Sequence, residues 1–122
     1  MYRIVFYRKK NGETPVLDYM RELSTSNTKD SRIKLNKIAQ YIKVLEEMGT
    51  RVGEPIVKHL HEEIWELRPS GDRILFAAVV NHTFVLLHSF HKKTQKTPKS
   101  EIQQAKRELD DYIERSDENE QP

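Results

Sequence analysis

Residues 64–98 read IWELRPSGDRILFAAVVNHTFVLLHSFHKKTQKTP, and this stretch decides the fold of the chain. It holds three runs rich in β-branched and aromatic residues, a composition typical of strands. The predicted strands are Ile64–Arg68, Arg73–Val80 and Thr83–Phe90. Residues 69–72, PSGD, predict the first turn, because proline and glycine suit a tight reversal. Residues 81–82, Asn-His, form a two-residue connection, and asparagine tolerates the positive φ that such hairpins need. We therefore expect a three-strand antiparallel meander.

Basic side chains gather at the ends of these predicted strands. Arg68 closes the first strand, and Arg73 opens the second strand directly across the turn. Further candidates follow at the end of the third strand: His88, His91, Lys92 and Lys93. Antiparallel pairing brings the end of the third strand beside the start of the second. We therefore expect a cationic cluster at one end of a small sheet.

The residues before the meander predict one strand and two helices. The strand is expected at 2–7, which is rich in aromatic and β-branched residues. Thr14 and Pro15 predict a helix start, because proline at the first helical position loses no hydrogen bond. The second helix is expected to begin at Asn27 and to stop at Gly49, since Leu35, Ile38, Ile42 and Leu45 recur at helical spacing. Residues 50–58 are expected to be a connector.

The residues after the meander predict a last helix and an acidic tail. Thr97 and Pro98 repeat the helix-start pattern, and apolar residues follow on one helical face. Residues 116–122, SDENEQP, contain no apolar side chain, so we expect a flexible tail beyond a domain formed by residues 1–115. The fold class is α+β: an N-terminal strand and the meander form a small antiparallel sheet, with the helical pair and the C-terminal helix on one face.

Composition narrows the functional classes. The chain has 122 residues and no cysteine, which excludes disulfides and cysteine-based zinc sites. His59 and His61 lack a third ligand at matching spacing, so we expect no metal site and no cofactor. The apolar run in MYRIVFYRKK is too short for a signal peptide, and no stretch has the length of a membrane span. We expect a cytoplasmic protein without membrane contact.

The net charge of +2 hides an asymmetry between the body of the chain and its end. Residues 108–122 hold seven acidic residues and one basic residue, a net charge of −6, whereas residues 1–107 hold 20 basic and 12 acidic residues, a net charge of +8. A basic body weakly favours a polyanionic partner. A charged, solvated surface explains the charge equally well.

Four segments together resemble a known family. The segments are IWELR, DRILFA, FVLLHSFHKKTQKTP and EIQQAKRELDDYI. In this order they resemble the phage Gp49-like branch of the HigB toxins, within the RelE/ParE toxin superfamily. The resemblance covers about residues 1–115, and FHKKTQKTP with the following helix is its most specific part.

The resemblance implies a RelE-like α+β fold and a function. It implies the toxin of a type II toxin–antitoxin system, a cytoplasmic endoribonuclease that cuts mRNA on the translating ribosome without a metal. It also implies a HigA-type helix-turn-helix antitoxin, through which the toxin would reach operator DNA. The predicted helices Pro15–Leu23 and Asn27–Met48 are plausible antitoxin-docking surfaces.

The motif match assigns site residues by resemblance. Metal-free RNA cleavage uses the ribose 2′-OH as nucleophile, and it needs proton transfer and a cation for the developing charge on phosphorus. Arg73 would clamp the scissile phosphate, because guanidinium matches phosphate bidentately. Arg68 and Lys93 would neutralise the RNA backbone, and Lys92 or His91 would transfer a proton. Three further residues are expected to contact RNA: Lys96, Lys99 and His88.

Alternatives remain open at this point. Arg68 and Arg73 can be strand-end charges paired with Glu66 and Asp72, and His88 can be a hydrogen-bonded structural residue. A toxin of the same fold could instead poison DNA gyrase through protein contacts. A non-catalytic nucleic-acid-binding module is the third interpretation.

Overall fold

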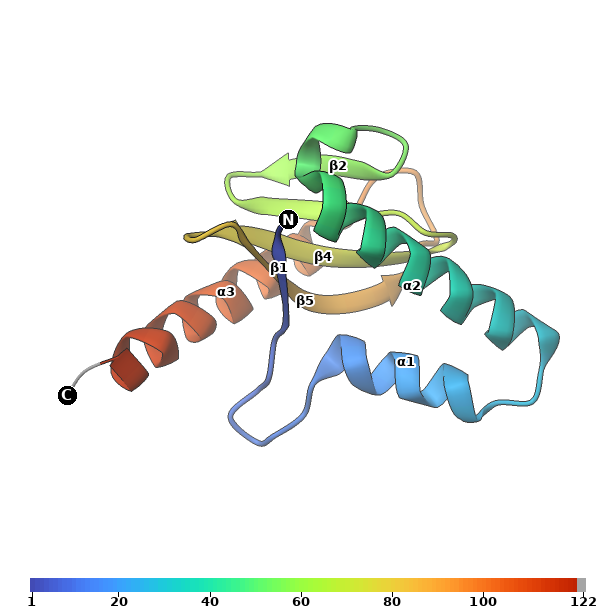
Figure 1. The fold of residues 1–122 in the computed structure, drawn as a ribbon, viewed down its shortest axis with the longest axis horizontal. Helices are drawn as coiled ribbons and strands as arrows, with labels where there is room; N and C mark the ends of the chain where they lie inside the picture. The colour runs from blue at the N-terminus through green and yellow to red at the C-terminus, as the bar shows by residue number, and fades with distance from the viewer. Residues whose placement is uncertain (121–122) are drawn as a thin grey trace.

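The computed structural model describes residues 1–120, with side chains described up to residue 116. A five-stranded sheet and three α-helices make up the described part of the chain (Figure 1). The strands are β1 (Arg3–Phe6), β2 (Val57–His61), β3 (Ile64–Leu67), β4 (Asp72–Val79) and β5 (Thr83–His91). The helices are α1 (Pro15–Thr25), α2 (Lys29–Met48), the short 3₁₀ helix η1 (Gly49–Val52) and α3 (Lys99–Glu120). The α+β fold class is confirmed.

The predicted meander is present as β3, β4 and β5. Both pairings are antiparallel, with Leu67 opposite Ile74 and Asp72 opposite His91. The β4–β5 turn has positive φ at Asn81 (63°) and His82 (54°), the conformation that a two-residue hairpin connection requires. Local sequence therefore specified the centre of the sheet correctly.

The edges of the sheet differ from the prediction. The strand order is β1-β5-β4-β3-β2, and β1 pairs with β5 in parallel, so the sheet is mixed and not purely antiparallel. Residues 57–61, expected as part of a connector and a lead-in, form the edge strand β2, in which Val57 lies opposite Leu67. Glycine, proline and histidine around this segment weakened its strand signal, whereas pairing with β3 stabilises it.

The helices cover both faces of the sheet, which corrects the expectation of a single helical layer. On one face, α1 and α2 pack on a core that includes Ile38, Leu45, Ile74 and Phe76. On the other face, α3 packs through Ala105 and Leu109 against Leu75, Ala77, Val85 and Leu87 (Figure 1). Successive strand residues point to opposite faces, so β4 and β5 contribute to both cores and read as nearly continuous apolar runs.

The helix ends confirm some of the predicted caps and correct others. Pro15 is the first residue of α1, as predicted, but the Asp18 carboxylate accepts from the Thr14 amide at 3.0 Å, and the Thr14 side chain does not cap the helix. Thr28, and not Asn27, is the N-cap of α2, because its hydroxyl accepts from the Ser31 amide at 3.1 Å. Gly49 ends α2 with φ of 68°, as predicted.

α3 extends beyond the predicted domain boundary. Its backbone is helical through Glu120, so residues 116–120, which were expected in the tail, belong to the helix. The final residues of the expected tail, 121–122, lie outside the described part of the chain. None of the described helices combines the length and apolar character needed to cross a membrane.

Candidate functional site

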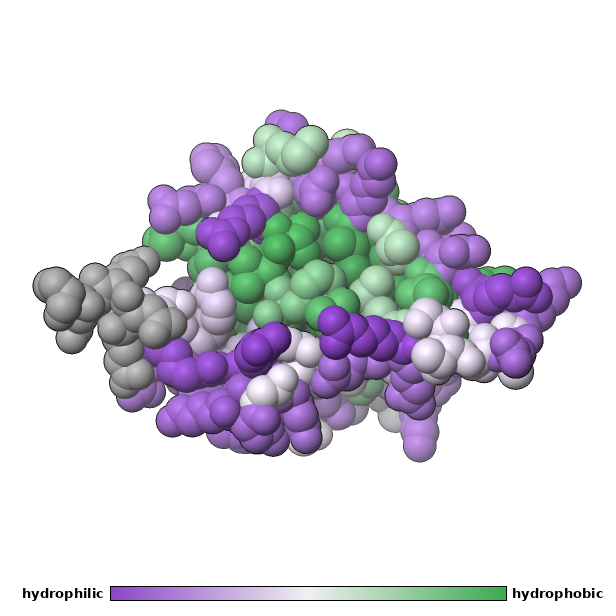
Figure 2. All heavy atoms as spheres, turned by 60° about the horizontal axis from the view of Figure 1, so that its bottom comes forward, coloured by the Kyte–Doolittle hydropathy of each residue, from purple (hydrophilic) through white to green (hydrophobic). Residues whose placement is uncertain are grey.

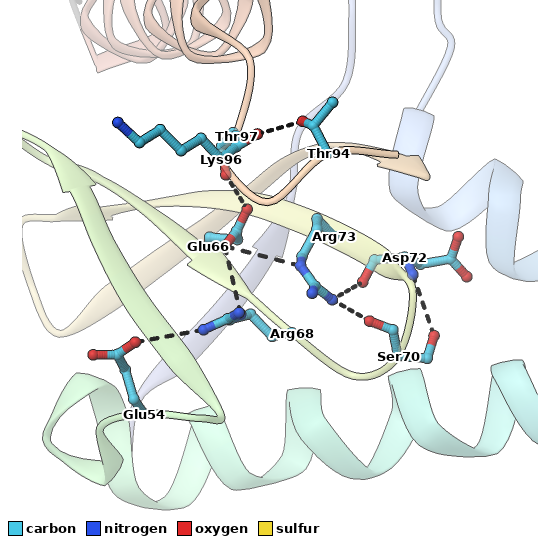
Figure 3. A network of polar contacts seen from close by, with 9 residues as sticks. All are labelled: Glu54, Glu66, Arg68, Ser70, Asp72, Arg73, Thr94, Lys96 and Thr97. Atoms are coloured by element: carbon cyan, nitrogen blue, oxygen red, sulfur yellow. Dashed lines mark hydrogen bonds and ion pairs between the residues drawn. The ribbon is translucent and has the colours of Figure 1, made fainter. Parts of the chain in front are cut away.

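The β3–β4 turn brings the two predicted arginines together. β3 ends at Leu67 opposite Ile74, and Arg73 is the second residue of β4, so Arg68 and Arg73 flank the same short connection. Figure 3 shows their guanidinium groups converging on Glu66, while the loop that follows β5 passes over the same carboxylate. The two arginines therefore lie close together, as predicted, and Glu66 lies between them.

Glu66 is a buried carboxylate with three partners. Its side chain is 1% exposed. One oxygen, Oε2, lies 3.7 Å from Nε of Arg68 and 3.9 Å from Nε of Arg73. The other oxygen, Oε1, accepts a hydrogen bond from the hydroxyl of Thr97 in the loop after β5. A buried carboxylate requires such partners, because removing its charge from water is costly. Glu66 therefore positions both arginines and fixes the loop above them.

Sequence reasoning considered Glu66 only as an ion-pair partner, not as the centre of the site. Its neighbours Trp65 and Leu67 face the α1–α2 core, so alternation places Glu66 on the other face of the sheet. An acidic residue between two apolar ones in a central strand is the available signal. The signal is weak, because outward-facing acidic residues on exposed sheet faces have the same pattern.

The guanidinium of Arg73 is largely enclosed, with 12% of the side chain exposed. Its Nη1 donates to the carbonyl oxygens of Ser70 and Asp72. Its Nε is buried and has no hydrogen-bond partner within the described residues. Burial lowers the pKa of Arg73, and the charge of Arg68 lowers it further against the opposing effect of Glu66. The group remains cationic at physiological pH, since guanidinium does not deprotonate in proteins.

Two lysines extend the positive charge of the arginine pair. Burial and the positive charges of Arg73 and Arg68 lower the pKa of Lys92. The backbone amide of Lys92 donates to the carbonyl of Gly71 at 2.9 Å and holds this residue against the β3–β4 turn. Lys58, opposite Glu66 in β2, also lowers the pKa of Lys92. Lys58 was missed because β2 was not predicted.

We call Arg68, Arg73, Lys92 and Lys58, grouped around Glu66, the cationic site. The two arginines lie within 3.9 Å of the buried carboxylate, Lys58 lies opposite it in β2, and Lys92 is hydrogen-bonded to the turn between the arginines. Glu54, 3.4 Å from Nη1 of Arg68, is the second acidic neighbour. Positive charge therefore exceeds negative charge by two. A partly enclosed surplus of this kind attracts an anion, and guanidinium and ammonium groups are the usual partners of phosphate.

His91 does not join the cationic site. It lies opposite Asp72, one residue before Arg73, and so faces the α1 side of the sheet. Its Nδ1 is 3.5 Å from Oδ1 of the buried Asp72, whose Oδ2 accepts from the hydroxyl of Tyr19 in α1. His91 is thus on a different face from Arg73, because neighbouring strand residues point in opposite directions.

The remaining loop lysines are exposed around the cationic site. Lys93, Lys96 and Lys99 follow β5 and lead into α3, and each is solvent-exposed. The Lys96 side chain extends away from Arg73 and Glu66 in Figure 3. These positions suit contact with a long polyanion, not with the group held by Arg73.

His88 is buried, which corrects the expectation of RNA contact. Its Nδ1 lies 2.6 Å from Oε1 of Glu108, and its Nε2 lies 2.9 Å from Oε1 of Glu101, both on α3. Burial alone would lower its pKa, but the hydrogen bonds and charges of Glu108 and Glu101 outweigh burial and raise the pKa of His88. α3 covers His88 because His88 occurs after the irregularity in the β4–β5 pairing and shares a face with Leu75.

The described residues form no evident metal-binding site. No group of three or more histidine and acidic side chains in residues 1–116 is arranged to hold a metal ion. The cationic site itself repels metal cations.

Comparison with known proteins identifies the family to which the chain belongs. A family model described as "Phage derived protein Gp49-like (DUF891)" matches residues 18–110, which include most of α1, all of α2 and the entire cationic site. No curated protein matches the chain. The match covers well over half of the sequence, so the chain belongs to the Gp49-like phage-derived protein family, a member of the RelE/ParE-like toxin group.

Proposed function

We propose that the chain is the toxin of a type II toxin–antitoxin system and that it cleaves mRNA on the translating ribosome. The observation that carries this proposal is the pairing of Arg68 and Arg73 on one buried carboxylate, with Lys92 beside them. The surplus of positive charge suits a phosphodiester, and membership of a toxin-like family supports the toxin role.

Three residues of the cationic site have a direct role in this proposal. Arg73, fixed by the turn carbonyls, holds a non-bridging phosphate oxygen, and Arg68 shares the developing negative charge. The ribose 2′-OH attacks phosphorus and releases its proton to water, while the bond from phosphorus to the 5′-oxygen breaks and this oxygen gains a proton. The products are a 2′,3′-cyclic phosphate and a 5′-hydroxyl. Lys92 donates the proton to the leaving oxygen, because its lowered pKa makes it a stronger acid than an ordinary lysine.

Surrounding lysines and an antitoxin complete the proposal. Lys93, Lys96 and Lys99 contact the RNA backbone around the scissile bond, where their exposure gives them access. A HigA-type helix-turn-helix antitoxin neutralises the toxin and carries the complex to operator DNA. The toxin needs no cofactor in this scheme.

Primer extension on a message translated by purified ribosomes tests the proposal. Lys92→Ala is the sharpest variant, because its side chain makes no hydrogen bond or ion pair within residues 1–116. We expect cleavage to fall on the order of a hundredfold for Lys92→Ala and also for Arg73→Ala. Lys37→Ala on α2 is the matched control and should cleave like wild type.

Folding must be checked separately for the arginine variant. Arg73 contacts Glu66 and two turn carbonyls, so circular dichroism should accompany each cleavage measurement. Folded Lys92→Ala and Arg73→Ala proteins with undiminished cleavage would contradict the proposed site. Growth arrest by a wild-type protein that leaves ribosome-bound mRNA intact would contradict the proposed reaction and favour a protein target such as gyrase.

A further inference from the structure

Asp72 is a buried carboxylate that the proposed cleavage reaction does not use. It is the first residue of β4 and is 3% exposed. Its side chain points to the same side of the sheet as Ile74 and Phe76, which belong to the α1–α2 core. On this side, Figure 2 shows hydrophobic residues gathered in the middle of the face that α1, α2 and β1 border. A charge buried beside such a core needs polar partners that hold it in place.

Two side chains from other elements hold the Asp72 carboxylate. The hydroxyl of Tyr19 in α1 donates to Oδ2 at 2.9 Å, and Nδ1 of His91 in β5 lies 3.5 Å from Oδ1. Burial, and then the hydrogen bond to Asp72, raise the pKa of Tyr19, so its hydroxyl stays protonated and remains a donor. The His91 ring also covers the β3–β4 turn, because a Cβ at Gly71 would lie 2.9 Å from its Cε1. Both α1 and β5 are therefore tied to the start of β4.

The backbone of Asp72 contacts Arg73 on the opposite face of the sheet. Its carbonyl oxygen accepts from Nη1 of Arg73 at 3.3 Å, and the Ser70 carbonyl accepts from the same Nη1. The Asp72 amide donates to the Ser70 hydroxyl at 3.3 Å, which ties the two carbonyl groups together. In Figure 3 the Asp72 carboxylate points away from Arg73. A displacement of that carboxylate would therefore move the two carbonyl oxygens that orient the guanidinium.

We propose that Tyr19 and Asp72 are positioning residues for Arg73 in the cleavage reaction. Tyr19 fixes the carboxylate, the carboxylate fixes the β3–β4 turn, and the turn carbonyls orient the guanidinium toward the phosphate. Neither residue touches RNA, and both act through Arg73. A misplacement of about 1 Å can cost on the order of a hundredfold in rate, so a small loosening of these contacts slows the chemical step. This inference rests on the proposed function for the reaction, whereas the contacts are properties of the structure.

A role in holding α1 on the sheet explains the Tyr19 hydroxyl less well. Val16 and Leu23 of α1 are 1% and 7% exposed, so apolar contacts already attach the helix to the core. A buried carboxylate costs desolvation free energy that an apolar side chain at the same position would avoid. The geometry that the carboxylate imposes on the turn accounts for its presence.

Steady-state cleavage of ribosome-bound mRNA by Tyr19→Phe tests the inference. The substitution removes only the hydroxyl that donates to Asp72 and retains the ring. We expect kcat to fall by about tenfold or more and KM to stay within about twofold of wild type, because Arg73 acts on charge that develops in the transition state. Tyr41→Phe on α2 is the matched control and should cleave like wild type. Tyr41 is also partly buried against the α1–α2 core, but its hydroxyl has no hydrogen-bond partner within residues 1–116.

A double-mutant cycle with Arg73 separates positioning from a general loss of structure. Arg73→Ala removes the group through which Tyr19 acts, so Tyr19→Phe should lower the residual kcat of Arg73→Ala by less than about twofold. A structural defect would lower kcat by the same factor in both backgrounds. Asp72→Asn, which keeps an oxygen acceptor for Tyr19, should retain more activity than Asp72→Ala. Loss of the folded state in Tyr19→Phe, seen by circular dichroism, would assign the hydroxyl to general stability and overturn the inference.

A spectroscopic measurement separates this inference from the proposed function. The Nε–H group of Arg73 is buried and has no hydrogen-bond partner within the described residues, so it should give a distinct ¹H–¹⁵N signal that is absent in Arg73→Lys. We expect Tyr19→Phe to shift this signal and Tyr41→Phe to leave it in place. A wild-type protein that does not cleave mRNA would overturn the proposed reaction, and a shifted signal would still leave the link from Tyr19 to Arg73 standing. Wild-type kcat, equal losses in both backgrounds, or an unmoved signal in Tyr19→Phe would overturn the inference.

Discussion

At the residue scale, Glu66 explains why two arginines can converge at the end of a small sheet. Their positive charges repel each other, and the carboxylate between them offsets this repulsion where water is largely excluded. Arg68 remains 22% exposed and Arg73 12% exposed, so an approaching anion can still reach both. Glu66 neutralises part of the charge and leaves the rest for a ligand.

Replacing Glu66 by glutamine should destabilise the protein. Glu66→Gln keeps a hydrogen-bond acceptor for Thr97 but removes the buried negative charge that faces both arginines. We expect the free energy of unfolding to fall by about 3 kcal/mol, the usual cost of leaving buried charges without their partner. Urea unfolding followed by circular dichroism measures the change.

Glu54→Gln is the matched control for this prediction. Glu54 pairs with the same Arg68, but its side chain is 66% exposed, so the loss should stay below about 1 kcal/mol. Equal losses for the two variants would show that burial of Glu66 does not govern the stability of the site.

At the element scale, the end of α2 depends on a glycine. Gly49 has φ of 68°, and a Cβ at this position would lie 2.6 Å from the Tyr2 ring. Gly49→Ala therefore combines backbone strain with a steric clash, and we expect a loss of about 2–4 kcal/mol of unfolding free energy. Thermal unfolding of the purified variant measures it.

Gly12→Ala separates the two contributions to that loss. Gly12 has φ of +94°, but no atom lies within 4 Å of an added Cβ, so this variant carries backbone strain alone. Its loss should be about 1 kcal/mol. If Gly49→Ala costs no more than Gly12→Ala, the approach of the Tyr2 ring to α2 is not a tight contact in solution.

α3 is held on the sheet by polar contacts as well as by its apolar stripe. His88 lies between Glu101 and Glu108, and Tyr7 donates to Asp111 at 2.6 Å farther along the helix. The pKa of His88 is raised in the folded state. Its contribution to stability is therefore fully present below its ordinary pKa of about 6.5 and is lost as the pH rises through the folded-state pKa.

The pH dependence of unfolding tests this attachment of α3. We expect the difference in unfolding free energy between wild type and His88→Gln to be largest near pH 6 and to shrink as the pH rises into the alkaline range. Urea titrations at a series of pH values measure it. His61→Gln, at an exposed position in β2, should follow wild type at every pH. A difference that grows with pH would contradict the raised pKa of His88.

At the scale of the whole molecule, basic and acidic side chains gather in different places. The cationic site and the exposed loop lysines lie at one end of the sheet, whereas the acidic residues of the sequence are concentrated in α3. A polyanion that binds the basic end releases counterions, so its affinity should fall as salt rises.

The salt dependence of single-stranded RNA binding provides the measurement. Lys92→Ala should reduce the slope of log K against log salt by about 0.7, the value expected for one lost phosphate contact on a single strand. Fluorescence anisotropy with a short labelled RNA is a suitable assay, and Lys37→Ala should leave the slope unchanged. If Lys92→Ala does not change the slope, Lys92 does not contact phosphate.

Local sequence was enough to predict the parts of this protein that depend on neighbouring residues. The β3–β5 meander, the Asn81-His82 turn and the stop of α2 at Gly49 follow from local composition and φ preferences. The proximity of Arg68 and Arg73 followed as well, because a short turn leaves their strands little freedom.

Long-range packing, in contrast, set how these elements pair, which face each helix covers and which side chains become buried. It paired β1 with β5 in parallel, recruited β2 to the sheet, placed α3 opposite the helical pair and thereby buried His88. It also brought Thr97 over Glu66 and made a strand glutamate the centre of the cationic site. These outcomes depend on contacts between residues far apart in the chain, and periodicity within one segment carries no information about which face a distant segment will cover.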